Sequence, residues 1–117
     1  MPEANNVSEI EGWDAKSFAD YAAVARETAE MVANLIAEAK SKANWGSHKP
    51  GLELIFYLSL IDYETKTLIH RLLSSPDDRY IWEKYLALHL YEVLEIAPAM
   101  IARAIKEMES PALLQKS

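Results

Sequence analysis

The sequence predicts an all-α protein, an antiparallel bundle of three long helices. Two observations carry this prediction. Only three Gly and five Pro occur in 117 residues, and four of the Pro lie outside the strongly periodic stretches. Both residues destabilise helix interiors, so their scarcity favours helices. In addition, apolar residues recur at steps of three and four over three long stretches, which is the period of an amphipathic helix.

The first helix is expected from Asp14 to a left-handed cap at Gly46. Asp14 is a favourable N-cap, and Trp13 before it is placed to pack on Phe18 as a hydrophobic staple. Gly is the residue that most often ends a helix in the left-handed conformation. The apolar seam of this helix is predicted to comprise Phe18, Tyr21, Ala25, Thr28, Val32, Leu35 and Ala39, flanked by Ala22, Ala29 and Ile36.

The second helix is expected to run from Pro50 to Ser74, because proline suits the first helical turn. Few polar residues occur between positions 54 and 63, so we expect this helix to be buried on more than one side. Its main apolar stripe comprises Leu54, Leu58, Ile61, Leu68 and Leu72.

The third helix begins at the segment Ser75-Pro76-Asp77-Asp78 and ends near Ser110. Ser75 is expected as N-cap, and acidic residues in a first turn interact favourably with the helix dipole. The short connection makes helices two and three antiparallel neighbours. Pro98 removes one backbone hydrogen bond and clashes with the carbonyl of Leu94. We expect a kink within one helix; a split there, giving four helices, is the alternative.

The chain is predicted to form one domain, residues 13–110, with a loosely packed arm at 1–12 and a short tail at 111–117. There is no cysteine, and the N-terminal segment lacks the basic and apolar regions of a secretory signal. No uninterrupted apolar run reaches the length of a membrane span. We therefore expect a soluble cytoplasmic protein that does not enter a membrane.

The net charge of −6 argues against nucleic-acid binding, which needs a basic surface for the phosphates. Residues 1–40 carry eight acidic and three basic side chains, and the remainder is nearly balanced. The acidic first helix is interpreted as a solvated face, with an acidic docking surface as the alternative.

The most suggestive polar cluster is His89-x-x-Glu92-x-x-Glu95, which places three polar side chains along one face of an apolar helix. It could form half of a metal site or an acid–base cluster. The pattern occurs once, however, and di-iron bundles need Glu-x-x-His motifs on two helices. We therefore expect no metal and no cofactor. Whether the strip is functional or is a structural face that meets solvent or partner hydrogen bonds stays open at this point. Asp62 is expected to be buried and paired with Arg79, Lys84 or Arg103.

Aromatic residues crowd the second helix and the first half of the third, so a ligand pocket near the Pro98 bend is also considered. Its candidate lining residues are Tyr57, Asp62, Trp82, Tyr85, His89 and Glu92.

Helices two and three carry more apolar surface than a three-helix domain can bury, which indicates a homodimer or another protein partner. The leading hypothesis is a non-enzymatic helical module for protein–protein interaction or regulation, acting through apolar helix faces. The alternative is a small-molecule-binding or metal-assisted catalytic bundle with a pocket near His89, Glu92 and Pro98. No catalytic motif or family resemblance supports a specific activity.

Overall fold

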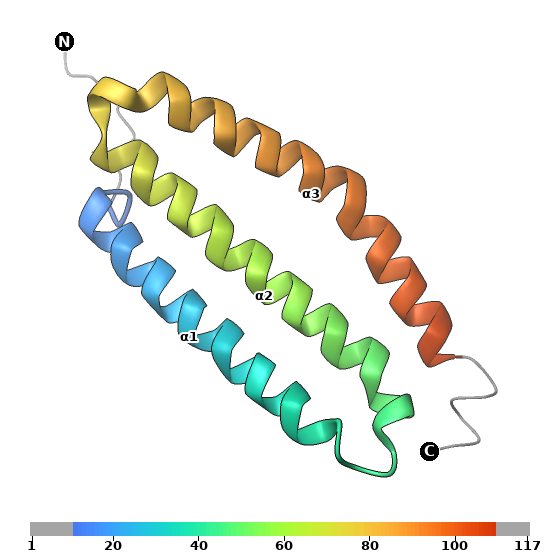
Figure 1. Cartoon of the computed structure of the whole chain (residues 1–117). Helices are drawn as coiled ribbons and strands as arrows, with labels where there is room; N and C mark the ends of the chain where they lie inside the picture. Colours follow the sequence, from blue (N-terminus) through green and yellow to red (C-terminus); the bar gives the residue numbers. More distant parts are fainter. Residues whose placement is uncertain (1–10, 110–117) are drawn as a thin grey trace.

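The computed structural model describes residues 11–109, and these residues form three long helices and no strand. The helices are α1 (Ala15–Ala39), α2 (Trp45–Ser74) and α3 (Arg79–Met108), with the short 3₁₀ turn η2 (Pro76–Asp78) between the last two (Figure 1). The all-α prediction is confirmed. The predicted arm and tail lie mostly outside the described residues.

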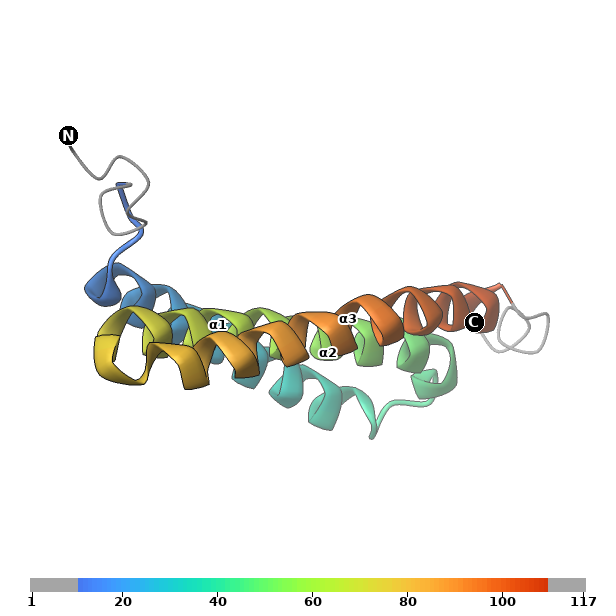
Figure 2. The same cartoon turned by 90° about the horizontal axis from the view of Figure 1, so that it is seen from above.

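The three helices form an open layer with α2 in the middle (Figure 1). α1 and α3 pack on opposite sides of α2, and within residues 11–109 they hardly touch each other. Seen from above, the helices overlap near η2, and α1 separates from α3 towards the other end (Figure 2). The molecule is accordingly elongated, 65 × 26 × 22 Å. Closure into a bundle and dimerisation remain predictions.

The start of α1 agrees with the sequence-based prediction. The Asp14 carboxylate accepts a hydrogen bond from the Ser17 backbone N–H at 2.7 Å. The rings of Trp13 and Phe18 lie 5.2 Å apart between centroids, as a hydrophobic staple requires. The cap and the staple together fix where the helix begins.

The connection between α1 and α2 differs from the prediction. α1 ends at Ala39, and Gly46 lies in the first turn of α2 instead of capping α1. Hydrogen bonds around Asn44 favour this earlier start: Ser47 donates to its carbonyl through both backbone N–H (3.2 Å) and hydroxyl (2.9 Å). Pro50 therefore sits in the second turn, where it leaves only the Gly46 carbonyl without its usual helical partner.

The connection between α2 and α3 is a 3₁₀ turn. The Asp78 N–H donates to the Ser75 carbonyl at 3.0 Å, and the Ser75 side chain makes no capping hydrogen bond, so the predicted side-chain cap is wrong. Asp77 and Asp78 lie in this 3₁₀ turn, directly before α3, and not in the first turn of α3 as predicted. α3 is continuous through Pro98 to Met108, which excludes the split into two helices.

The core lies mainly between α1 and α2, and it agrees with the predicted seam of α1 only in part. The buried side chains of α1 are Phe18, Ala22, Ala25, Ala29 and Val32, whereas Tyr21 and Leu35 are exposed. Both sets follow steps of three and four, so periodicity could not distinguish them. The small alanines let α2 approach closely, which selects this set. In contrast, α2 and α3 contribute one buried residue each, Pro50 and Ala104.

Candidate functional site

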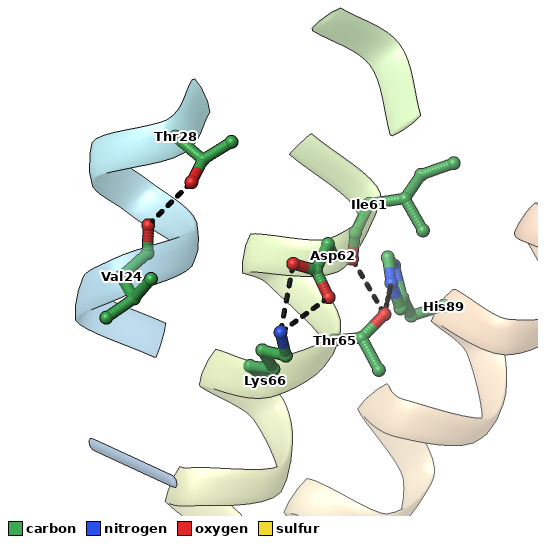
Figure 3. Close-up of polar contacts among 7 residues, drawn as sticks. All are labelled: Val24, Thr28, Ile61, Asp62, Thr65, Lys66 and His89. Carbon is green, nitrogen blue, oxygen red and sulfur yellow. Dashed lines mark hydrogen bonds and ion pairs between the residues drawn. The ribbon is translucent and has the colours of Figure 1, made fainter. Parts of the chain in front are cut away.

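Asp62 is not the buried partner of a base on α3, as the sequence suggested. Its side chain is 51% exposed and pairs with Lys66, one turn along α2, at 3.0 Å (Figure 3). The bases expected as partners lie elsewhere. Arg79 pairs with Glu83 and Arg103 with Glu107, each within α3. Each of the three pairs joins two residues that lie four positions apart on the same helix. Such pairs are mostly solvated, and each contributes about 0.3–0.5 kcal/mol to stability.

His89 connects α3 to α2. Its Nε2 lies 2.8 Å from the hydroxyl oxygen of Thr65 (Figure 3). That hydroxyl donates its hydrogen to the Ile61 carbonyl at 2.7 Å, so it accepts from His89. Glu92 and Glu95, the other members of the polar strip, are exposed. Across residues 11–109 no three His, Asp or Glu side chains are grouped closely enough to hold a metal ion.

The aromatic candidates form a small cluster near η2. The rings of Trp82 and Tyr85 lie 5.9 Å apart, and the Arg71 guanidinium lies 6.0 Å from the Trp82 ring, a cation–π distance. Tyr57 is half-buried on α2.

Two shallow hollows lie beside α2, and none of the six predicted pocket residues lines either of them. The first, of about 170 Å³, lies between the start of α2 and the end of α3. The second, of about 220 Å³, lies between α1 and α2. The first is lined by Lys49, Pro50, Glu53, Leu54, Met100, Arg103, Ala104 and Glu107. The second is lined by Ala19, Ala22, Ala23, Arg26, Tyr63, Thr67 and His70.

The most extensive feature is an apolar face that crosses all three helices. On α1 and α3 the exposed apolar residues recur at helical steps beside the packed seams, and on α2 they lie between the sides that contact α1 and α3. At 100° per residue, the stripes of α1 and α3 lie about 100° from the sides of these helices that contact α2, and Ile55 and Leu58 lie between the two contact sides of α2. With α2 antiparallel to its two neighbours, this geometry puts the three stripes on one side of the layer. We call this surface the apolar face. It comprises Tyr21, Val24, Met31 and Leu35 of α1, Ile55 and Leu58 of α2, and Leu90, Leu94, Ile101, Ile105 and Met108 of α3.

The opposite side of the layer is more polar. It includes Tyr85 and Ile96, but its exposed charged residues come from every helix: Arg26, Glu30, Glu64, Arg71, Glu92 and Arg103. On the apolar face, by contrast, the Asp62–Lys66 pair neutralises the charges in the middle of α2. The layer therefore has two chemically different sides.

The sequence contained part of the signal for this face. The core seam predicted for α1 includes Tyr21, Thr28 and Leu35, whereas the structure places these residues on the exposed side. The sequence does predict an excess of apolar residues on α3. It could not predict that the three stripes lie on the same side of the layer, because this depends on how the helices pack.

The segment Pro76–Met108 is long and apolar enough to cross a membrane by length and composition, and none of its most apolar stretch is buried. The same test is also passed by helices of proteins that never enter a membrane. The sequence prediction that no segment enters a membrane therefore remains untested.

Comparisons with known proteins returned no match: no family model, no curated protein and no solved structure matches this chain.

Proposed function

We propose that this protein is a non-enzymatic helical interaction module that pairs through its apolar face with a second copy of itself. The observation that carries the proposal is the continuity of exposed apolar side chains over α1, α2 and α3. Contiguous apolar patches of this kind mark association sites, since single exposed apolar residues need no such explanation. Pairing two layers face to face would close them into a six-helix bundle.

The protomer's small core supports this proposal. None of the large side chains in the described residues is fully buried, and the buried side chains of α1 are mostly alanines. Burial of apolar side chains is the main stabilising contribution to folding, and it must offset the conformational entropy of the chain. A partner that covers the apolar face would supply the burial that the single layer lacks.

Magnitudes favour a stable pair. Full burial of an exposed Leu or Ile contributes about 1.5–3 kcal/mol, and association costs about 4–15 kcal/mol in lost freedom. The most exposed of the set, Leu94, is 75% exposed. With eleven apolar side chains on each copy, partial burial is enough to exceed that cost.

A second copy also fits the surface better than a lipid bilayer does. An isologous pair apposes the same face of both molecules, so it covers all three stripes and leaves no open end. In addition, the net charge of −6 disfavours attachment to an anionic lipid surface.

The test is the mass in solution, measured by size-exclusion chromatography with light scattering at micromolar concentration. The full chain is expected at twice its 13.2 kDa mass. Leu94→Lys should give a monomer, because it places a charge in the proposed interface. The matched control is Leu88→Lys, about 120° around α3, where the leucine is 49% exposed on another side. Leu88→Lys should remain a dimer.

Circular dichroism of both variants shows whether α-helical content is retained. A monomeric wild type, or a Leu94→Lys protein that stays dimeric, would disprove the proposal. Flotation with phosphatidylcholine and phosphatidylglycerol vesicles tests the membrane alternative. Binding of the wild-type chain to vesicles without dimer formation would likewise count against it.

A further inference from the structure

The hollow between α1 and α2 has a polar character that the helix packing does not explain. Its α1 side consists of Ala19, Ala22 and Ala23, whose small side chains leave the space open. Its polar lining comes from Arg26 on α1 and from Tyr63, Thr67 and His70 on α2. It lies on the side of the layer away from the apolar face.

Thr67 is the first sign of a missing partner. Its hydroxyl oxygen is buried and makes no hydrogen bond within the described part of the chain. Other helical hydroxyl groups, for example Ser59 and Thr65, donate to the carbonyl four residues earlier, at 2.8 and 2.7 Å. Thr67 does not use this local acceptor, although leaving a buried hydroxyl unpaired is costly.

Arg26 is the second sign. Arg79 and Arg103 each pair with a glutamate four residues on, and Arg71 lies over the Trp82 ring. Arg26 also has a glutamate four residues on, Glu30, yet no ion pair joins them in residues 11–109. Arg26 is instead one of the residues that line the hollow.

His70 holds the end of the hollow in place. Its Nδ1 lies 2.9 Å from the Ala15 carbonyl, and because a carbonyl only accepts, Nδ1 carries the hydrogen. This bond ties the start of α1 to α2 and leaves Nε2 as the second polar atom of the ring. The hollow is therefore bounded at a fixed helix–helix contact.

We infer that this hollow binds a small oxyanion, a carboxylate or a phosphate group. Arg26 supplies the charge and a planar pair of N–H donors, which suit either group. The hydroxyl of Tyr63 and the unpaired hydroxyl of Thr67 supply neutral donors. An oxyanion accepts hydrogen bonds at several lone pairs at once. One ligand could therefore pair with Arg26 and, after a rotation about χ1 of Thr67 that turns its buried hydroxyl toward the hollow, with Thr67 as well. The inference concerns the α1–α2 groove and is independent of dimer formation.

The experiment is isothermal titration calorimetry of the full chain with sodium phosphate and, separately, sodium acetate. Sodium chloride holds the ionic strength constant, so that general screening does not change during the titration. Saturable binding of either probe is expected; phosphate alone would indicate a phosphate site and acetate alone a carboxylate site. The same titration on Leu94→Lys separates this outcome from any failure of the dimer proposal.

Two variants test the residues. Arg26→Gln should weaken binding about ten-fold or more, since a hydrogen bond to a charged group is lost. Thr67→Val should weaken it several-fold while leaving the fold intact. Arg79→Gln is the matched control, because it removes the same charge from α3, which does not line the hollow, and its affinity should equal that of the wild type. Absence of saturation with both probes, or equal weakening by Arg26→Gln and Arg79→Gln, would overturn the inference.

Discussion

The hydroxyl of Thr65 accepts a hydrogen bond from His89 Nε2 at 2.8 Å and so links α2 to α3. Both residues are half-buried between α2 and α3, two helices that bury few side chains. The polar residue of α3 that the sequence marked as a possible catalytic group thus has a structural partner.

Thr65→Val is expected to destabilise the protein by about 1–2 kcal/mol, because it leaves His89 without its partner. Thr67→Val, two residues on, is the matched comparison. It removes an unpaired buried hydroxyl at nearly constant volume, so we expect it to be neutral or stabilising by up to about 1 kcal/mol. Urea unfolding followed by circular dichroism measures both variants. Equal losses in the two would show that neither hydroxyl has the role assigned to it.

Asp14 makes stability depend on pH in the acidic range. The hydrogen bond from the Ser17 backbone N–H holds the pKa of Asp14 below the ordinary value of an aspartate side chain. A lowered pKa means that the folded protein favours the ionised carboxylate. This stabilisation is complete when the pH is above the pKa that Asp14 has in the unfolded chain. It disappears as the pH falls through the lower pKa that Asp14 has in the folded protein.

We therefore expect Asp14→Ala to lower the melting temperature more at pH 7, where the cap is ionised, than at pH 2. Asp14→Asn should keep most of the cap at both pH values, because an amide oxygen can still accept the hydrogen bond. Thermal unfolding across this pH range is the measurement. An Asp14→Ala penalty that is the same at pH 2 and pH 7 would contradict the role of the ionised cap.

Ala29→Leu tests the close approach of α1 to α2. Ala29 is 4% exposed, so a larger side chain has no room and should cost about 1–3 kcal/mol. Ala37→Leu provides the control on the same helix, because Ala37 is exposed. Its effect should stay within about 0.5 kcal/mol. Chemical unfolding at equal protein concentration compares the two, and a destabilised Ala37→Leu would point to contacts beyond the layer.

Pro98→Ala is expected to stabilise the protein by about 1–3 kcal/mol. The residue lies inside a continuous helix and is exposed, so its replacement restores the hydrogen bond to the Leu94 carbonyl without opening a cavity. Thermal unfolding measures the change, and the mass in solution is followed in parallel. If stability falls instead, the local geometry imposed by Pro98 is required for packing or for pairing.

The sequence predicted the helical class and the start of α1 because these depend on neighbouring residues. Asp14, Trp13 and Phe18 act within a few positions of one another, and the structure contains both their cap and their staple. The end of α1 was missed because Gly46 and Pro50 each fitted a familiar position. Hydrogen bonds to the Asn44 carbonyl begin α2 earlier.

The hollow between α1 and α2 could not be predicted from the sequence, for a different reason. Thr67 and Arg26 lie 41 positions apart, and neither has a motif around it. Thr67 lacks the hydrogen bond that a helical hydroxyl usually makes, and Arg26 lacks the ion pair with Glu30. Only the packing of α1 against α2 shows that these two residues line the same hollow. Asp62 shows the converse: a carboxylate in an apolar stretch suggested burial, but α2 remains open on that side and Lys66 is within reach.

The central position of α2 also determines how the protein can come apart. Because α1 and α3 hardly touch, each is held only by its own contact with α2, as in a one-dimensional array. Detachment of α3 leaves the α1–α2 hairpin and the buried alanines of α1 intact. Detachment of α1, in contrast, removes most of the core. Amide hydrogens of α3 in the free protomer should thus exchange first, and formation of the dimer should slow them more than those of α1.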